Sequence, residues 1–126
     1  MYRILKMTNH VKYDEQLRQY TLYYEGIQFC WDEVPTDVNV EIAKLLAANY
    51  HKNIDIIAIF IYNEIRDWYG DVTTIDEVKT RIGMPIIEPD RDAVTYCEQT
   101  FDDTHIFSFT FRDDEFKDLH YFAIDG

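Results

Sequence analysis

The longest apolar pattern in the chain runs from Asn53 to Gly70 and predicts a helix around which the other elements are organised. Apolar residues recur at the spacing of one helix face, and a second apolar line covers much of the other side. The first face is Ile54, Ala58, Ile61, Ile65 and Trp68, and the second line is Ile56, Ile59 and Phe60. Asn53 is expected to cap the start, and Gly70 to close the end in a left-handed conformation. A helix with this pattern is expected to be buried nearly all round.

The same region contains a β-branched run, residues 54–61, which can also be read as a buried strand. The apolar pattern continues to Tyr69, beyond the usual length of a strand, and this length favours the helix. A membrane-spanning helix is not predicted, because the run is too short for about 30 Å of hydrocarbon. It is also interrupted by Glu64, Arg66 and Asp67.

Two further helices are predicted, one on each side of the first. The earlier helix begins at Pro35–Thr36 and ends near His51–Lys52, where cations suit the negative end of the helix dipole. Its predicted inward stripe is Val38, Ile42, Leu45, Leu46, Asn49 and Tyr50. The later helix, Ile75–Ile82, is expected to start with a capping box of Thr74 and Glu77. Its predicted inward residues are Ile75, Val78 and Ile82.

A β-hairpin is predicted from Gln19–Tyr24 and Ile27–Asp32, joined by the two-residue turn Glu25–Gly26. Residues whose numbers sum to 51 then lie opposite one another, and three large apolar pairs share one face. These pairs are Tyr24 with Ile27, Leu22 with Phe29, and Tyr20 with Trp31. The other face is mixed and is expected to face water; it holds Gln19, Thr21, Tyr23, Gln28, Cys30 and Asp32.

Other strands complete the predicted sheet. Tyr2–Met7 forms a first strand, and the polar stretch Thr8–Gln16 is expected to be a loop. The later strands are Pro85–Glu88, Ala93–Thr100, His105–Arg112 and Leu119–Asp125. A tight turn at Asp102–Asp103, or a four-residue loop in the same register, pairs Tyr96 with Phe109 and Val94 with Phe111. The chain is therefore predicted to be one α+β domain, an antiparallel sheet with three central helices on one face, in the order βββ-ααα-ββββ.

Composition adds a strong acidic charge to this picture. The chain of 126 residues has 24 Asp plus Glu against 12 Lys plus Arg, a net charge of −12. Such a surface repels nucleic acid and anionic membranes and attracts basic partners, although acidic excess also serves solubility alone. The N-terminus lacks the features of a signal peptide, which favours a cytoplasmic protein. Cys30 and Cys97 are too few for a disulfide framework and are expected to be reduced core residues.

No catalytic or cofactor motif is visible, so we predict neither an enzyme activity nor a cofactor. The acidic clusters fall in predicted turns, where Asp side chains commonly bond local backbone amides. Residues 113–118 lack the Gly and Glu positions of a calcium loop. A transition-metal site is conceivable at Cys97, His105 and His120 if their strands are neighbours. The simpler interpretation is that these are sheet residues with polar tips in water.

The remaining interpretation is a protein-binding surface. From Pro85 to the end, eleven acids and three bases give −8, two thirds of the net charge in one third of the chain. The carboxylates predicted to capture a basic protein are Asp102, Asp103, Asp113, Asp114, Glu115 and Asp118. Tyr23 is predicted to be an aromatic anchor on the wet face of the hairpin. We expect the protein to be a monomer or a weak homodimer.

Residues 71–78, 82–87 and 121–126 resemble small bacterial domains of unknown function. Some of those domains stand near polymorphic toxin genes and are taken for immunity proteins. The resemblance covers roughly residues 50–126 and carries no catalytic residue. It implies a non-enzymatic protein that neutralises a basic toxin domain.

An alternative is a phage-type inhibitor whose acidic face imitates DNA and blocks a nuclease. A DNA mimic needs carboxylates in rows that follow the duplex phosphates, whereas a toxin inhibitor needs only one compact acidic patch. The positions of the carboxylates in the fold therefore distinguish the two hypotheses.

Overall fold

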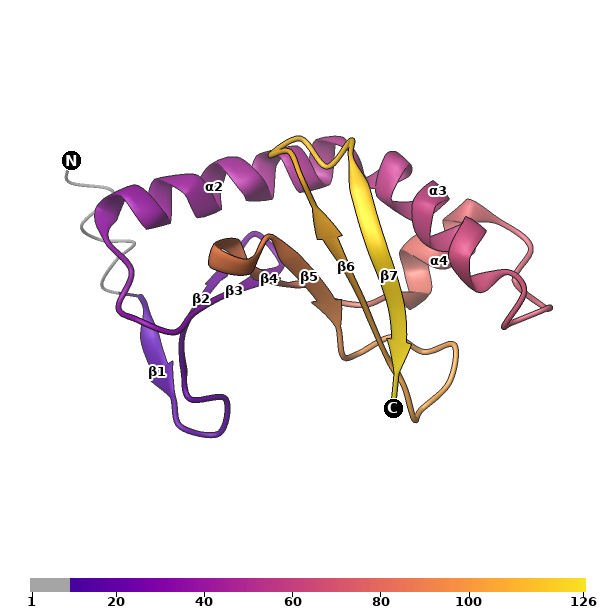
Figure 1. Ribbon diagram of the computed structural model, residues 1–126, viewed down its shortest axis with the longest axis horizontal. Helices are drawn as coiled ribbons and strands as arrows, with labels where there is room; N and C mark the ends of the chain where they lie inside the picture. The colour runs from indigo at the N-terminus through magenta and orange to yellow at the C-terminus, as the bar shows by residue number, and fades with distance from the viewer. Residues whose placement is uncertain (1–9) are drawn as a thin grey trace.

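The computed structural model describes residues 10–126, so the predicted strand Tyr2–Met7 lies outside the described residues. Within them, seven strands form one sheet in chain order, and three α-helices lie between β3 and β4 in the sequence (Figure 1). The strands are β1 (Lys12–Asp14), β2 (Gln19–Tyr24), β3 (Ile27–Trp31), β4 (Ile86–Glu88), β5 (Ala93–Tyr96), β6 (Ile106–Phe111) and β7 (Leu119–Asp125). The helices are α2 (Asp37–Lys52), α3 (Ile54–Ile65) and α4 (Ile75–Arg81), and a 3₁₀ turn, η1, covers Pro89–Arg91. The α+β class is confirmed, but the sheet is only mostly antiparallel, because β3 and β4 are parallel where an antiparallel sheet was predicted.

The predicted hairpin is confirmed to the residue. Strands β2 and β3 pair Tyr20 with Trp31, Leu22 with Phe29, and Tyr24 with Ile27. Glu25 and Gly26 have φ of 50° and 77°, as a two-residue turn between strands of normal twist requires. Local turn chemistry and apolar pairing agree here, and this agreement makes the register predictable.

The opposite face of the hairpin is less wet than predicted. Tyr23 and Asp32 are exposed, but Thr21, Gln28 and Cys30 are buried. They are shielded because β1 and β4 flank the hairpin, so both of its strands are internal to the sheet. The prediction of a loop over Thr8–Gln16 missed β1, a three-residue edge strand without apolar alternation. Burial raises the pKa of the Cys30 thiol to about 11, which keeps it protonated and unreactive.

The helices and one face of the sheet enclose an apolar core. At its centre the hydroxyls of Tyr50 on α2 and Tyr96 on β5 form a buried hydrogen bond of 2.6 Å. On α3, Phe60 stands edge-on to Phe109 of β6 and Phe122 of β7, with ring centroids 5.6 and 6.2 Å apart. Helix α2 thus packs over the middle of the sheet, and α3 over β6 and β7.

Helix α3 is amphipathic, and the prediction that it is buried nearly all round was wrong. Its predicted first face is confirmed, because Ala58, Ile61 and Ile65 are buried. Ile56 and Ile59 on the second line are 37 and 44 % exposed. Helix α3 lies on the outside of a single sheet, so the side that faces away from the sheet stays in water. Within residues 10–126, no helix is long and apolar enough to cross a membrane.

Both predicted ends of α3 also need correction. The helix ends at Ile65, and Trp68 is 68 % exposed beyond it. The chain turns there because the amides of Trp68 and Tyr69 both donate to the carbonyl of Ile65, at 2.9 Å. Gly70 is not in the left-handed region. Asn53 makes no side-chain cap; its amide group bonds a loop described below.

Helix α2 buries a different stripe from the predicted one. Leu46 and Tyr50 are buried as expected, but the other buried residues are Val40, Ala43 and Ala47. The predicted inward residues Val38, Ile42 and Leu45 are 68, 40 and 50 % exposed. The two alanines explain the rotation, because their small side chains allow the helix backbone to approach the sheet closely. A capping box between Thr36 and Asn39 fixes the start of the helix.

Helix α4 follows its prediction at its start, although the capping box is only half formed because Glu77 bonds the residue before the N-cap. The Thr74 hydroxyl accepts a hydrogen bond from the Glu77 amide at 3.1 Å, and the Glu77 carboxylate accepts one from the Thr73 amide at 3.1 Å. Val78 and Ile82 are buried. The local capping signal was therefore sufficient to predict this helix.

The predicted register between β5 and β6 was wrong by two residues. Tyr96 pairs with Phe107 and Val94 with Phe109. The inward face is the predicted one, since a shift of two residues preserves the side-chain alternation. The shift arises because β5 ends at Tyr96 and residues 97–105 form a loop longer than the tight turn or four-residue loop of the prediction.

Candidate functional site

The loop between β6 and β7 is organised by Asp113. Its carboxylate accepts hydrogen bonds from the amides of Glu115 (2.9 Å), Lys117 (3.2 Å) and Asp118 (2.6 Å). The half-buried Asp113 side chain therefore holds the turn together and is poorly placed to contact a partner. Phe116 has φ of 59° and a fully buried side chain.

Three contacts fix this loop to the helices. The Phe116 ring stands edge-on to Tyr50 of α2, with ring centroids 5.6 Å apart. The Asn49 side-chain amide donates to the carbonyl of Asp114, and that of Asn53 donates to the carbonyl of Glu115, both at 2.9 Å. Asn49 and Asn53, expected in the core stripe and at a helix cap, instead bind the backbone of an acidic loop.

Three acidic side chains of this loop lie at the surface. Asp114, Glu115 and Asp118 are exposed. Glu115 lies 3.5 Å from the Lys117 ammonium group, and Asp118 is hydrogen bonded to His120. Within residues 10–126, Asp114 forms no ion pair. The loop therefore presents carboxylates from a backbone that the helices hold in place.

The loop between β5 and β6 is different, because the Asp102 carboxylate is hydrogen bonded within the loop itself. One carboxylate oxygen accepts hydrogen bonds from the Tyr69 hydroxyl and lies 2.8 Å from Nδ1 of His105. The other accepts from the Gln99 amide group and from the backbone amides of Thr104 and His105. These bonds, the one from Tyr69 first, hold the pKa of Asp102 far below its usual range.

Burial, and then the neighbouring Asp102 carboxylate, raises the pKa of Tyr69 to about 12, so its hydroxyl remains a donor. The paired Asp102 and His105 resemble the orienting half of a catalytic dyad. Gly126 lies close to the His105 ring, since an added Cβ would lie 2.7 Å from it. We interpret Asp102 as a structural centre of the loop. Asp103 beside it is exposed.

The six predicted carboxylates do not form one patch. Asp102 and Asp103 precede β6, and residues 113–118 follow it, so the two groups lie at opposite ends of that strand (Figure 1). The six residues of β6 separate them by about 20 Å at roughly 3.3 Å per residue.

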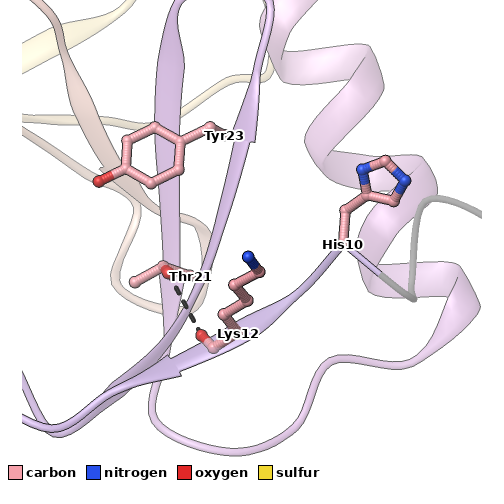
Figure 2. A pocket seen from close by; sticks show the side chains of 4 residues that line it. All are labelled: His10, Lys12, Thr21 and Tyr23. Atoms are coloured by element: carbon pink, nitrogen blue, oxygen red, sulfur yellow. Dashed lines mark hydrogen bonds between the residues drawn. The ribbon is translucent and has the colours of Figure 1, made fainter.

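Tyr23, the predicted anchor, lies in yet another place. It is 63 % exposed on β2 and borders a hollow of about 480 Å³ together with His10, Lys12 and Thr21 (Figure 2). The Lys12 side chain stands between Tyr23 and His10, and the Lys12 carbonyl accepts a hydrogen bond from Thr21 at 3.2 Å. This neighbourhood is polar and partly cationic, so Tyr23 does not adjoin the acidic loops.

The exposed aromatic residue beside the β6–β7 loop is Tyr121, which the sequence analysis missed. Ser108 pairs with Ala123 and Thr110 with His120, so two residues of β7 lie opposite Phe109 in a β-bulge. Tyr121 occupies the bulge with φ of 57° and is 74 % exposed, more than any other large apolar side chain of residues 10–126. The sequence signal for this bulge is the odd spacing between the inward residues of β7.

Two acidic residues near β3 and β4, Asp32 and Glu88, share one arginine within the protein. Arg91 forms ion pairs with Asp32, at 2.6 Å, and with Glu88. Gln19 also donates to both carboxylates, at 3.2 and 2.9 Å. The bonds from Gln19 and then Arg91 lower the pKa of Asp32. These carboxylates are therefore unavailable to a cationic partner.

The conceivable metal site is not assembled. His120 pairs with Thr110, five residues from His105 along β6, a separation of about 16 Å. Cys97 is exposed, which corrects its assignment to the core. Among residues 10–126, no group of three or more His, Cys, Asp or Glu side chains is placed to hold a metal ion.

Comparisons with protein-family models, with curated proteins and with solved structures found no match to this chain. The function is therefore argued from the surface alone.

Proposed function

We propose that this protein is a non-enzymatic inhibitor, of the immunity-protein type, which binds a basic protein through the β6–β7 loop and Tyr121. The observation that carries the proposal is the combination of exposed carboxylates on a fixed loop with the most exposed aromatic side chain. Tyr121 follows Asp118 by three residues, a distance of about 10 Å along the strand.

Each part of this surface has a distinct role in the proposal. Asp114, Glu115 and Asp118 increase the rate of encounter with a cationic protein. The Tyr121 ring then supplies the apolar contact that slows dissociation. The left-handed conformation of Tyr121 costs about 1 kcal/mol or more, and a contact with a partner is one reason for a protein to keep a tyrosine there.

The distribution of carboxylates favours this proposal over imitation of DNA. A DNA mimic needs rows of available acids, but Asp102 is engaged by its own loop. The exposed carboxylates of residues 113–118 are one compact group, as inhibition of a basic toxin domain requires.

Capture of binding proteins from the organism of origin, with the tagged chain as bait, tests the proposal. The tagged chain should retain a basic protein at low salt and lose it as the salt concentration rises, because screening weakens charge attraction. Tyr121→Gly should fold normally, since glycine favours positive φ, and yet retain the protein for a shorter time. Retention of acidic proteins only, or retention unaffected by salt and by Tyr121→Gly, would contradict it.

A further inference from the structure

Helix α2 leaves an apolar stripe exposed along its first half. Val38, Ile42 and Leu45 follow the i, i+4, i+7 spacing of one face and are 68, 40 and 50 % exposed. Val34, 64 % exposed, extends the stripe before the first turn. Figure 1 shows α2 along the outer side of the molecule, with the sheet beneath it. An apolar row of this kind is typical of an interaction surface.

Charged residues of opposite sign lie at the start of this stripe and at the far end of α2. Glu33 lies at its start, and Lys52 lies in the last turn of α2. This face of the helix therefore passes from negative to positive. A second copy of the same helix, lying antiparallel, presents its positive end to the negative end of the first.

We propose that this stripe is the interface of a homodimer in which the α2 helices of two copies cross in antiparallel orientation. A two-fold axis near Ala43 places Ile42 and Leu45 of both copies at the centre. The same axis places Lys52 of each copy opposite residue 34 of the other, beside Glu33. Such an interface is self-complementary and closes at two subunits.

The size of the face limits the strength of the dimer. A helix of sixteen residues is about 24 Å long, and one face of it buries less than the roughly 1,200–2,000 Å² of stable complexes. The net charge of −12 adds repulsion between copies. The dimer is therefore weak and forms at high concentration. A cationic partner fits this face less well, because its two ends carry opposite charges.

Sedimentation equilibrium of the whole chain over a range of concentrations, in 0.15 M salt, tests the proposal. The average mass should rise from 15.1 kDa towards twice that value. Leu45→Asp and Val38→Asp should each abolish the rise. Leu17→Asp is the matched control, because Leu17 is 47 % exposed in the turn between β1 and β2, and it should leave the rise intact.

Charge reversal tests the antiparallel arrangement. Lys52→Glu should weaken dimerisation by about tenfold, because each substitution acts twice in a symmetric dimer. Glu33→Lys combined with Lys52→Glu should restore it. A chain that stays at 15.1 kDa at every concentration, or equal losses in Leu17→Asp and Leu45→Asp, would overturn the dimer. Failure of the double reversal to restore association would overturn the antiparallel orientation. If the chain is monomeric and Leu45→Asp instead loses a captured protein, the face belongs to that partner.

Discussion

The loops at the two ends of β6 have similar acidic sequences, but they differ in which carboxylates are bonded within the loop and which are exposed. Before β6, the Asp102 carboxylate points into its own loop and is held by Tyr69, Gln99 and His105. After β6, the Asp113 carboxylate also binds its own loop, but Phe116 and amide groups on the helices hold the rest, so Asp114 and Glu115 remain outside. A carboxylate is available to a partner when the order of its loop comes from other contacts. Counting acids along a sequence does not reveal this difference.

The largest expected effect is the loss of the apolar anchor after β6. Phe116→Ala should lower the free energy of unfolding by about 3–5 kcal/mol, because it empties a fully buried site beside Tyr50 and Phe111. Urea denaturation followed by circular dichroism measures the change. Phe101→Ala, in the loop before β6, is the matched control and should cost less because Phe101 is only half-buried. An equal or larger cost for Phe101→Ala would contradict the contrast between the loops.

A smaller loss is expected for Asp102→Asn, and it should depend on pH. The native pKa of Asp102 lies below its value of about 3.9 in the unfolded chain. Its stabilising effect is therefore complete above about pH 4 and is lost as the pH falls through the native pKa. Asp102→Asn should lower the unfolding temperature at pH 7 and flatten the acid dependence of stability. Asp103→Asn should change neither, and an equal effect of both variants would show that Asp102 has no special role.

The amide groups on the helices should contribute less again. Asn49→Ala and Asn53→Ala should each cost about 0.5–1.5 kcal/mol, the net value of one hydrogen bond. Hydrogen exchange should increase in residues 113–118 and remain unchanged in the loop before β6. Asn63→Ala, at an exposed position of α3, is the control. Unchanged exchange after both substitutions would mean that the helices do not order the loop.

The smallest effect on stability is expected for the outward carboxylates. Asp114→Asn combined with Glu115→Gln should change the free energy of unfolding by less than about 0.5 kcal/mol, as is usual for surface positions. Thermal denaturation measures this change. A larger loss would show that these side chains serve the fold.

The sequence predicted the parts of the fold in which local signals agree. In the hairpin of β2 and β3, the turn Glu25–Gly26 and the apolar pairs support one register. In α2, the inward face was predicted from the large residues Val38 and Leu45, but the buried residues include Ala43 and Ala47. Apolar residues are common on protein surfaces, and small residues allow closer packing, so side-chain size alone chose the wrong face.

The candidate site was predicted only in part. The exposed acids Asp114, Glu115 and Asp118 were predicted, and so was Asp102, whose bond to Tyr69 joins distant segments. Tyr121 was not among the predicted site residues. The inward residues Leu119 and Phe122 are three apart, and this odd spacing is the mark of the bulge.

The central claim is that the carboxylates after β6 attract a cationic partner, and the association rate tests it most directly. Stopped-flow measurements with the captured protein would compare Asp114→Asn/Glu115→Gln with a control variant, Glu64→Gln/Asp67→Asn. Glu64 and Asp67 are exposed near the end of α3, and the control removes the same amount of charge. We predict that the first variant associates roughly threefold to tenfold more slowly at low salt, with dissociation unchanged and a weaker dependence on salt. Equal association rates for the two variants would contradict the claim.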